Sequence, residues 1–207
     1  MPRIDRAARA LELVSFDAQY RTGGLVVAGM DEAGRGPLAG PVVTACVVMR
    51  DDSALAWVDD SKKLSEKRRE LLFDSILSEC IAYGIGVATA DEIDRINILQ
   101  ATKKAMRDAA AQVRADVFLI DAVTGLGLNG REVPIVKGDA TSYSIAAASI
   151  LAKVTRDRMM KELDRQYPMY GFARNKGYVT AAHIEALRQY GPCPEHRRSF
   201  IGHFVLP

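Results

Sequence analysis

The chain has 207 residues, of which 48% are hydrophobic and 26% are charged, with a formal net charge of +2. These values are typical of a globular domain, and the length predicts a single domain that can bury its own core. No apolar run approaches the roughly 20 residues of a membrane-spanning helix, and the N-terminus lacks the layout of a secretory signal. The three cysteines, Cys46, Cys80 and Cys193, have no paired spacing, so we expect no disulfide framework and a cytoplasmic protein.

The apolar pattern predicts strands and helices in a mixed order along the chain. A leading helix over 3–20 precedes two strands, 24–30 and 41–49, which a glycine-rich loop joins. We then expect a helix over 65–80, a strand over 81–88, a helix capped by Thr89 and another helix over 97–113. Strands over 117–120 and 133–136, an alanine-rich helix over 142–160 and a last helix from Thr180 to Gly191 follow. This order predicts an α/β domain, a mixed sheet flanked by helices.

Three predicted strands end at acidic residues, namely Asp31 with Glu32, Asp121 and Asp139. One such acid means little, because polar residues commonly resume where a strand ends. Neighbouring strands can, however, bring three acidic strand ends together, and this favours a shared site. Two carboxylates about 4 Å apart repel by about 4 kcal/mol at an effective dielectric of about 20, so a cluster of four calls for cations. Oxygen ligands without paired His or Cys favour Mg²⁺ or Mn²⁺ over Zn²⁺.

Two features of the first acidic segment leave its geometry open. Adjacent residues in a regular strand point to opposite faces, so Asp31 and Glu32 reach one ion only if the strand bends there. The loop Gly34-Arg35-Gly36 superficially matches a dinucleotide-binding loop, but such a loop requires a following helix, and a strand is predicted here. An ordinary tight turn and a loop that contacts a ligand remain the alternatives, and the adjacent acids favour contact.

Basic residues recur in clusters that could form a phosphate-binding face, although solvated helix surface is the plain alternative. The clusters contain Lys62, Lys63, Lys67, Arg68, Arg69, Lys153, Arg156, Arg158, Arg174, Lys176, Arg197 and Arg198. Asp157 is expected to be an ion-pair partner on a helix surface. The histidines at 183, 196 and 203 lack ligand spacing, so we expect structural roles for them.

The motifs along the chain resemble those of the ribonuclease HII family. The most specific is DEAGRGPLAGP over 31–41, and the resemblance continues in order through 60–64, 92–94, 97–99, 119–121, 137–140, 144–153, 175–178 and 196–200. It implies one catalytic domain, with an RNase H-like core over about 24–160 and a C-terminal helical extension over about 161–207. Related ribonuclease HIII proteins carry a different glycine loop and an extra N-terminal domain, and neither is seen here.

The resemblance also implies an activity and a set of site residues. The activity is hydrolysis of RNA in RNA–DNA hybrids and incision 5′ of ribonucleotides embedded in duplex DNA, as in ribonucleotide excision repair and DNA replication. The family's catalytic, metal-binding acids fall on Asp31, Glu32, Asp121 and Asp139. Its loop falls on Gly34, Arg35 and Gly36, which would recognise the ribose 2′-hydroxyl. Its junction tyrosine falls on Tyr178, which would stack on the following deoxyribose, although Val179 departs from the usual Gly or Pro.

The mechanism expected from these residues is hydrolysis with two divalent ions, Mg²⁺ or Mn²⁺, bridged by Asp31, which leaves 5′-phosphate and 3′-hydroxyl ends. Proposed phosphate contacts are Lys62, Lys63, Arg174 and Lys176. We expect a monomer with no membrane association and no obligatory protein partner, and residues 201–207 contain no motif for a replication clamp. Two alternatives are a metal-dependent nuclease for DNA junctions, which would not need a 2′-hydroxyl reader, and a non-catalytic hybrid-binding module, which would not need four acids.

Overall fold

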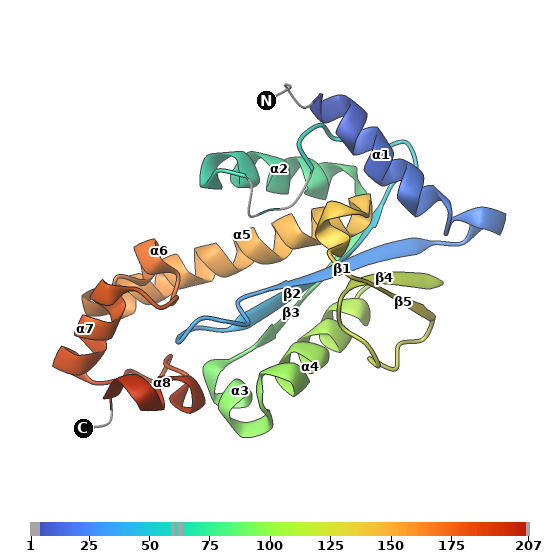
Figure 1. Cartoon of the computed structure of the whole chain (residues 1–207). Coiled ribbons are helices and arrows are strands. Elements are labelled where there is room, and N and C mark those ends of the chain that lie inside the picture. Colours follow the sequence, from blue (N-terminus) through green and yellow to red (C-terminus); the bar gives the residue numbers. More distant parts are fainter. Residues whose placement is uncertain (1–4, 59–60, 62–63, 206–207) are drawn as a thin grey trace.

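The computed structural model describes residues 5–58, 61 and 64–205, which form a five-stranded mixed sheet with helices on both faces (Figure 1). The strand order is β3-β2-β1-β4-β5. β1 pairs antiparallel with β2, which pairs antiparallel with β3, while β4 is parallel to both β1 and β5. The strands are β1 (Val27–Ala33), β2 (Val42–Met49), β3 (Cys80–Ala88), β4 (Val117–Asp121) and β5 (Arg131–Ile135). The predicted mixed sheet is confirmed.

The helices form a layer on each face of the sheet and a group at one end (Figure 1). One layer contains α5 (Tyr143–Gln166), which contacts β1 and β2, together with α1 (Arg6–Ala18) and α2 (Glu66–Glu79). The other contains α4 (Ile98–Ala110), which contacts β2 and β3, and α3 (Ala90–Ile96). The C-terminal group contains α6 (Phe172–Asn175), α7 (Ala181–Tyr190) and α8 (Arg198–Val205). Short 3-10 helices are η1 (Thr22–Gly24), η3 (Gly138–Ala140) and η4 (Pro168–Tyr170).

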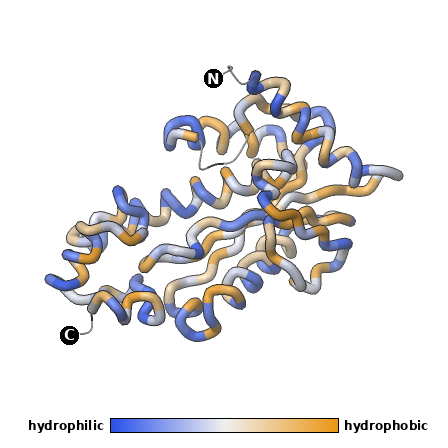
Figure 2. Tube along the Cα trace, in the orientation of Figure 1, coloured by the Kyte–Doolittle hydropathy of each residue, from blue (hydrophilic) through white to orange (hydrophobic). Residues whose placement is uncertain are grey.

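Apolar core residues lie on both faces of the sheet (Figure 2). The interior strand β2 is therefore buried at every position and apolar at nearly every one. The α5 layer rests very close to β1 at Gly29, where a Cβ would lie only 2.0 Å from the carbonyl carbon of Ser144. The run Ala146–Ala148 in α5 is fully buried. The small residues of α5 therefore allow this helix to pack closely against the sheet.

The main differences from the predicted elements concern β1, α5 and α8. β1 begins three residues later than expected and continues through both acids to Ala33, because its pairing with β2 extends to Ala33 and Val43. The helix expected to stop at 160 continues to Gln166, so the boundary placed near residue 160 falls inside α5. α8 follows the helix that was expected to be the last.

The three cysteines are free, and Cys46 is buried. No helix within the described part of the chain combines the length and apolar character that crossing a bilayer requires.

Candidate active site

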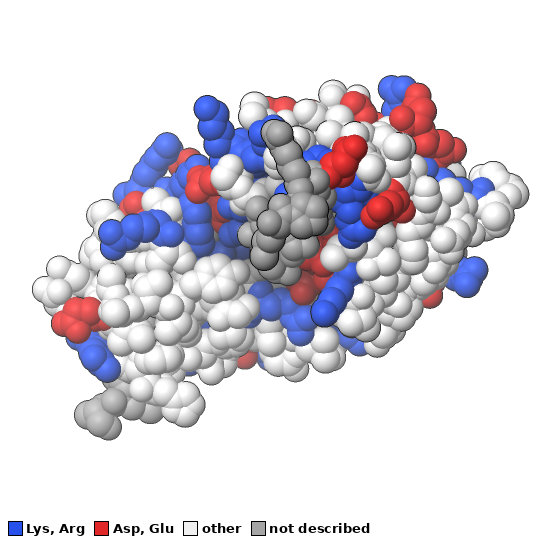
Figure 3. Space-filling model, turned by 45° about the horizontal axis from the view of Figure 1, so that its top comes forward, with Lys and Arg blue, Asp and Glu red and all other residues white. Residues whose placement is uncertain are grey.

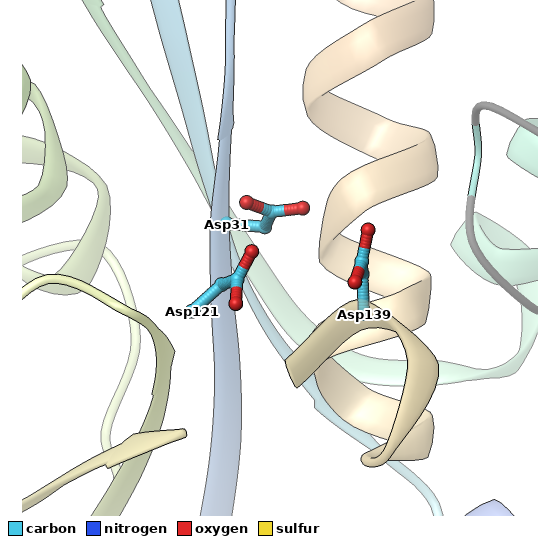
Figure 4. Close-up of side chains that lie close together, drawn as sticks. All are labelled: Asp31, Asp121 and Asp139. Carbon is cyan, nitrogen blue, oxygen red and sulfur yellow. The ribbon is translucent and has the colours of Figure 1, made fainter. Parts of the chain in front are cut away.

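Three carboxylates from separate elements lie together at one end of the sheet (Figure 4). Asp31 is in β1, Asp121 ends β4 and Asp139 is in η3, and one oxygen of each lies within 4.8 Å of the other two. Asp31 and Asp139 are buried, and Asp121 is half-buried. The fold thus gathers three of the four acids that the sequence placed in one site.

The strand pairing explains why Asp31 and Asp121 meet. β1 and β4 are parallel neighbours with Met30 opposite Ile120, so the next residue of each strand is an aspartate at the same end of the sheet. Side chains alternate between faces along a strand, and Leu119, two residues before Asp121, packs against Ile145 of α5. Both aspartates therefore face the α5 layer.

Asp139 reaches the site on a turn and not on a strand. β5 ends at Ile135, and the left-handed backbone of Lys137, with φ of 57°, redirects the chain into η3. The Gly138 amide donates to Asp121 Oδ1 at 2.8 Å, and Arg9 of α1 donates to the Ala140 carbonyl. Hydrogen bonds on both sides of Asp139 thus hold its turn in place.

Glu32 lies beside these carboxylates but outside the group of three. β1 keeps its regular pairing through Asp31–Ala45 and Glu32–Thr44, so the bend that would turn both side chains to one side is absent. Glu32 lies 3.3 Å from Arg35, and its Oε2 is buried without a hydrogen-bond partner among the described residues. The fourth predicted acid therefore approaches from the other face, with one oxygen unengaged.

Asp31 and Glu32 resist ionisation in the absence of a cation. Burial raises the pKa of Asp31 well above its ordinary value, and the charges of Glu32 and Asp121 raise it further. Burial also raises the pKa of Glu32, although the Arg35 guanidinium opposes this rise. Clustered oxygen ligands, an unengaged buried oxygen and raised pKa values together fit a hard divalent cation, which Asp31, Asp121 and Asp139 would hold with Glu32 nearby.

The glycine loop that follows the acids is fixed from below by Arg197. This side chain is fully buried, and it donates to the carbonyl oxygens of Gly34, Arg35, Pro37 and Gly40 at distances between 2.6 and 3.0 Å. Burial, together with the nearby charge of Arg156, lowers the pKa of Arg197 to about 9. The carbonyl groups of the loop thus point inward, towards the buried guanidinium group of Arg197.

Arg156 makes a second buried contact of the same kind. It is fully buried in α5 and donates to the carbonyl oxygens of Ala39, Pro41 and Lys176 at 2.9 to 3.0 Å. Gly34 has φ of +97°, and a Cβ there would lie 2.0 Å from Arg156 Nε. Arg156 therefore joins the glycine loop to the segment that carries Tyr178.

The expectation of basic clusters on the surface is wrong for Arg156 and Arg197. Both were placed in a phosphate-binding face, yet neither is accessible. A signal for Arg156 was present in the sequence, because it continues the stripe Ser149, Ala152, Arg156 and Met160, whose spacings of three and four residues mark the buried side of a helix. We find no comparable signal for Arg197. Figure 3 shows other Lys and Arg side chains on one face of the molecule, with acidic side chains among them.

The remaining predicted substrate residues fall in different environments. Tyr178 is 43% exposed, with its ring centroid 6.0 Å from Lys153 Nζ and 5.8 Å from Arg156 Cζ. Arg174 is exposed, whereas Lys176 is mostly buried and its ammonium donates to the Ala173 carbonyl at 2.6 Å. Lys176 therefore supports its own loop, and its role as a phosphate contact stays a prediction. Lys62 and Lys63 lie outside the described residues.

Asp157 and two histidines are internal groups. Asp157 is the expected ion-pair partner, 2.6 Å from Lys153 and 3.6 Å from Arg69, but it is buried and not on the helix surface. His183 and His196 are buried and lie 3.0 Å apart through their Nε2 atoms, which agrees with the expected structural roles.

Comparison with known proteins identifies a family. A family model described as Ribonuclease HII matches residues 28–203. A protein named ribonuclease HII from Acetivibrio thermocellus is 52% identical over 201 residues, which cover 96% of this chain and 78% of that protein.

Two solved structures with the same fold bear related names. The ribonuclease H2 from Pyrococcus horikoshii OT3 is 30% identical, with a TM-score of 0.68 over 84% of this chain and 92% of that one. The RNase HII of Archaeoglobus fulgidus, solved as a complex with PCNA, is 26% identical, with a TM-score of 0.76 over 87% of this chain and 97% of that one. These likenesses confirm the RNase H-like architecture that the sequence predicted.

Proposed function

The chain belongs to the ribonuclease HII family and is an RNase H endonuclease, and we propose that it also incises duplex DNA 5′ of embedded ribonucleotides. The observation that carries this proposal is the adjacency of two features at the end of β1. Buried carboxylates suited to divalent cations lie next to a glycine loop held rigid by two buried arginines. One feature suits hydrolysis of a phosphodiester, and the other suits recognition of the sugar beside it.

We assign the catalytic role to Asp31, Asp121 and Asp139 as ligands for two divalent ions, Mg²⁺ or Mn²⁺, with Glu32 as a fourth ligand from the opposite face. Glu32 Oε2 is a buried carboxylate oxygen without a hydrogen-bond partner among the described residues, and a bound cation would supply one. The chemistry that such ions supply when bound is activation of a water molecule and stabilisation of charge on the leaving 3′-oxygen. The products would carry 5′-phosphate and 3′-hydroxyl ends.

We assign recognition of the ribose to the loop Gly34-Arg35-Gly36. Its carbonyl groups at Gly34 and Arg35 accept from Arg197, which leaves the opposite side of the loop for the substrate. Gly36 has no other atom within 4 Å of the position that a Cβ would take, so a sugar can approach its backbone closely. A 2′-hydroxyl distinguishes RNA from DNA at a single nucleotide, which is the discrimination that this activity requires.

The rest of the substrate path is proposed from exposure and from the family resemblance. Tyr178 offers an exposed ring that can stack on the deoxyribose after the junction. Arg174 can meet phosphates, and the same role is proposed for Lys62 and Lys63 from their place in a basic cluster of the sequence. These contacts position the duplex without reading its sequence, and they should weaken with salt.

The PCNA complex concerns the archaeal relative only. For this chain an untethered monomer stays the prediction, as does the cytoplasm, whose reducing conditions suit three free cysteines.

The proposal is tested with end-labelled duplexes that contain no ribonucleotide, one ribonucleotide or several. We expect cuts on the 5′ side of ribonucleotides, which require Mg²⁺ or Mn²⁺ and disappear with a chelator. Equal cutting of the all-DNA duplex would favour a junction nuclease, and binding without any cutting would favour a hybrid-binding module.

The catalytic assignment is tested by Asp31→Asn. This change keeps the shape of the side chain and removes one ligand charge, so turnover should be lost while the duplex still binds in a gel-shift assay. Asp74→Asn, at an exposed position of α2, is the matched control and should cleave like the parent. Full activity of Asp31→Asn would refute the assignment.

A further inference from the structure

A series of hydrogen bonds through two buried histidines links the backbone at Tyr178 to the backbone at Cys193. His183 Nδ1 lies 2.9 Å from the Tyr178 carbonyl oxygen, and His183 Nε2 lies 3.0 Å from His196 Nε2. The Cys193 amide donates to His196 Nδ1 at 3.0 Å. Both imidazole side chains are buried, so these contacts replace water as their hydrogen-bond partners.

The backbone groups at the two ends of this hydrogen-bond series determine which nitrogen of each imidazole carries a proton. A carbonyl oxygen only accepts, so His183 must carry a proton on Nδ1, and its Nε2 then accepts in the neutral ring. A backbone amide only donates, so His196 must accept on Nδ1 and carry its proton on Nε2. His196 Nε2–H therefore donates to His183 Nε2, and both rings are neutral.

The surroundings favour neutral rings. The Phe172 ring meets His183 edge-on at 5.5 Å between centroids, and the Tyr170 ring meets His196 edge-on at 4.7 Å. Burial lowers the pKa of His183, and burial together with His183 lowers the pKa of His196 to about 4. The hydrogen-bond order is therefore retained at neutral pH.

The hydrogen-bond series helps to fix the backbone from which the Tyr178 ring projects. The Tyr178 amide donates to the Asn175 carbonyl at 2.9 Å, and the neighbouring Gly177 carbonyl accepts from the Leu38 amide at 2.8 Å. His183 supplies the contact to the Tyr178 carbonyl itself. Within the described part of the chain, the Tyr178 ring lies about 6 Å from the cations of Lys153 and Arg156, which are long contacts, so the hydrogen bonds of its backbone contribute to its direction.

We propose that the neutral pair His183–His196 is a positioning unit that sets the orientation of Tyr178 against the sugar at an RNA–DNA junction. This inference rests on the proposed stacking role of Tyr178. His183 acts on the Tyr178 carbonyl, and His196 acts by presenting a donor to His183. Neither ring touches the reacting atoms.

Two substitutions of His183 separate its two hydrogen bonds. His183→Asn places an amide nitrogen near the position of Nδ1 and can still donate to the Tyr178 carbonyl. His183→Gln reaches towards the position of Nε2 and leaves that carbonyl without a donor. We expect His183→Gln to raise KM for a single-ribonucleotide duplex about tenfold, the effect of one lost hydrogen bond, with a smaller change in kcat. His183→Asn should lie nearer the parent, and the exposed His203→Gln is the control.

A double-variant cycle with Tyr178→Ala distinguishes positioning from general damage. If His183 acts through Tyr178, adding His183→Gln to Tyr178→Ala should raise KM little further. Unchanged KM in Tyr178→Ala would refute the stacking role in the proposed function. Raised KM in Tyr178→Ala with parental KM in His183→Gln, or full additivity in the double variant, would refute the positioning unit.

The proton positions can be measured in the parent protein, so the proposal does not depend on a variant that folds. Nitrogen NMR of the imidazoles at pH 7 should show His183 protonated on Nδ1 and His196 protonated on Nε2. The opposite tautomer at either ring, or a charged ring, would overturn the proposal.

Discussion

The carboxylate of Asp31 is buried beside two other carboxylates, and this arrangement opposes folding until a cation binds. Burial and the like charges of its neighbours both favour the protonated form. A divalent ion offsets both effects, so we expect metal binding and stability to be linked through this residue.

Asp31→Asn should therefore stabilise the metal-free protein while it removes activity. The variant lacks a carboxyl group that must either ionise beside like charges or take up a proton on folding, so its free energy of unfolding should rise by on the order of 1–3 kcal/mol in the presence of a chelator. The gain in stability that Mg²⁺ gives the parent should become smaller in the variant. Urea denaturation with chelator and with Mg²⁺ measures both effects, and Asp74→Asn should follow the parent. A variant less stable than the parent in chelator would contradict this account.

Gly34 and Gly36 lie two residues apart, but substitution should affect them differently: stability at Gly34 and substrate access at Gly36. Gly34 has a left-handed backbone and touches Arg156, so Gly34→Ala should lower the free energy of unfolding by about 1–3 kcal/mol. Gly36 has open space around it, so Gly36→Ala should change stability by less than about 0.5 kcal/mol. Cleavage of a single-ribonucleotide duplex should nevertheless fall with Gly36→Ala, because its methyl group would occupy the space that we assign to the sugar. Equal thermal stability of the two variants would contradict this distinction.

Helix α1 lies outside the residues that the family model matches, yet it contacts the site. Arg9 donates to the Ala140 carbonyl beside Asp139, and the buried Asp17 accepts from the Ser144 amide in the first turn of α5. The sequence did not indicate a role for this helix. Its contacts indicate that it supports the turn that carries the third aspartate.

Arg9→Ala should weaken binding of divalent ions by up to about tenfold, as removal of a group that orients a ligand does. Titration calorimetry with Mn²⁺ on the intact chain measures this affinity independently of turnover, and Arg9→Lys should restore part of it. Arg165→Ala is the control, because Arg165 also forms an exposed ion pair with a glutamate three residues away in its helix. An unchanged Mn²⁺ affinity in Arg9→Ala would show that α1 does not support the site.

At the scale of the molecule, the glycine loop after β1 connects the sheet with the C-terminal helices. Arg197 precedes α8 and donates to carbonyl groups that follow β1. The side chain of lysine cannot supply the same fork of donors, so Arg197→Lys should lower the free energy of unfolding by about 2–4 kcal/mol and reduce activity. Thermal unfolding measures the change, and the exposed neighbour Arg198→Lys should be close to neutral. Parental stability of Arg197→Lys would mean that the loop does not need this contact.

The sequence predicted the sheet and most helices well, because apolar periodicity and capping residues such as Thr89 are local signals. Asp31, Asp121 and Asp139 could be grouped because three strands led to them. The exit of Asp139 through η3 could not be predicted, since it depends on a left-handed Lys137 and on the distant Arg9. Arg156 and Arg197 were misjudged because a charged residue suggests a surface. The helical stripe indicated that Arg156 is buried, but only the assembled fold supplies the carbonyl groups that surround both side chains.

The two buried arginines also have a consequence for the energetics of substrate recognition. A loop that must order itself on binding loses conformational entropy at that moment, and the loss subtracts equally from the affinity for a ribose and for a deoxyribose. Here the carbonyls at Gly34, Arg35 and Pro37 are already held by Arg197 before any duplex arrives. The loop pays this entropy during folding, so, with the loop assigned to the ribose as proposed, discrimination between the two sugars would depend on the fit of one hydroxyl group against backbone that is already ordered.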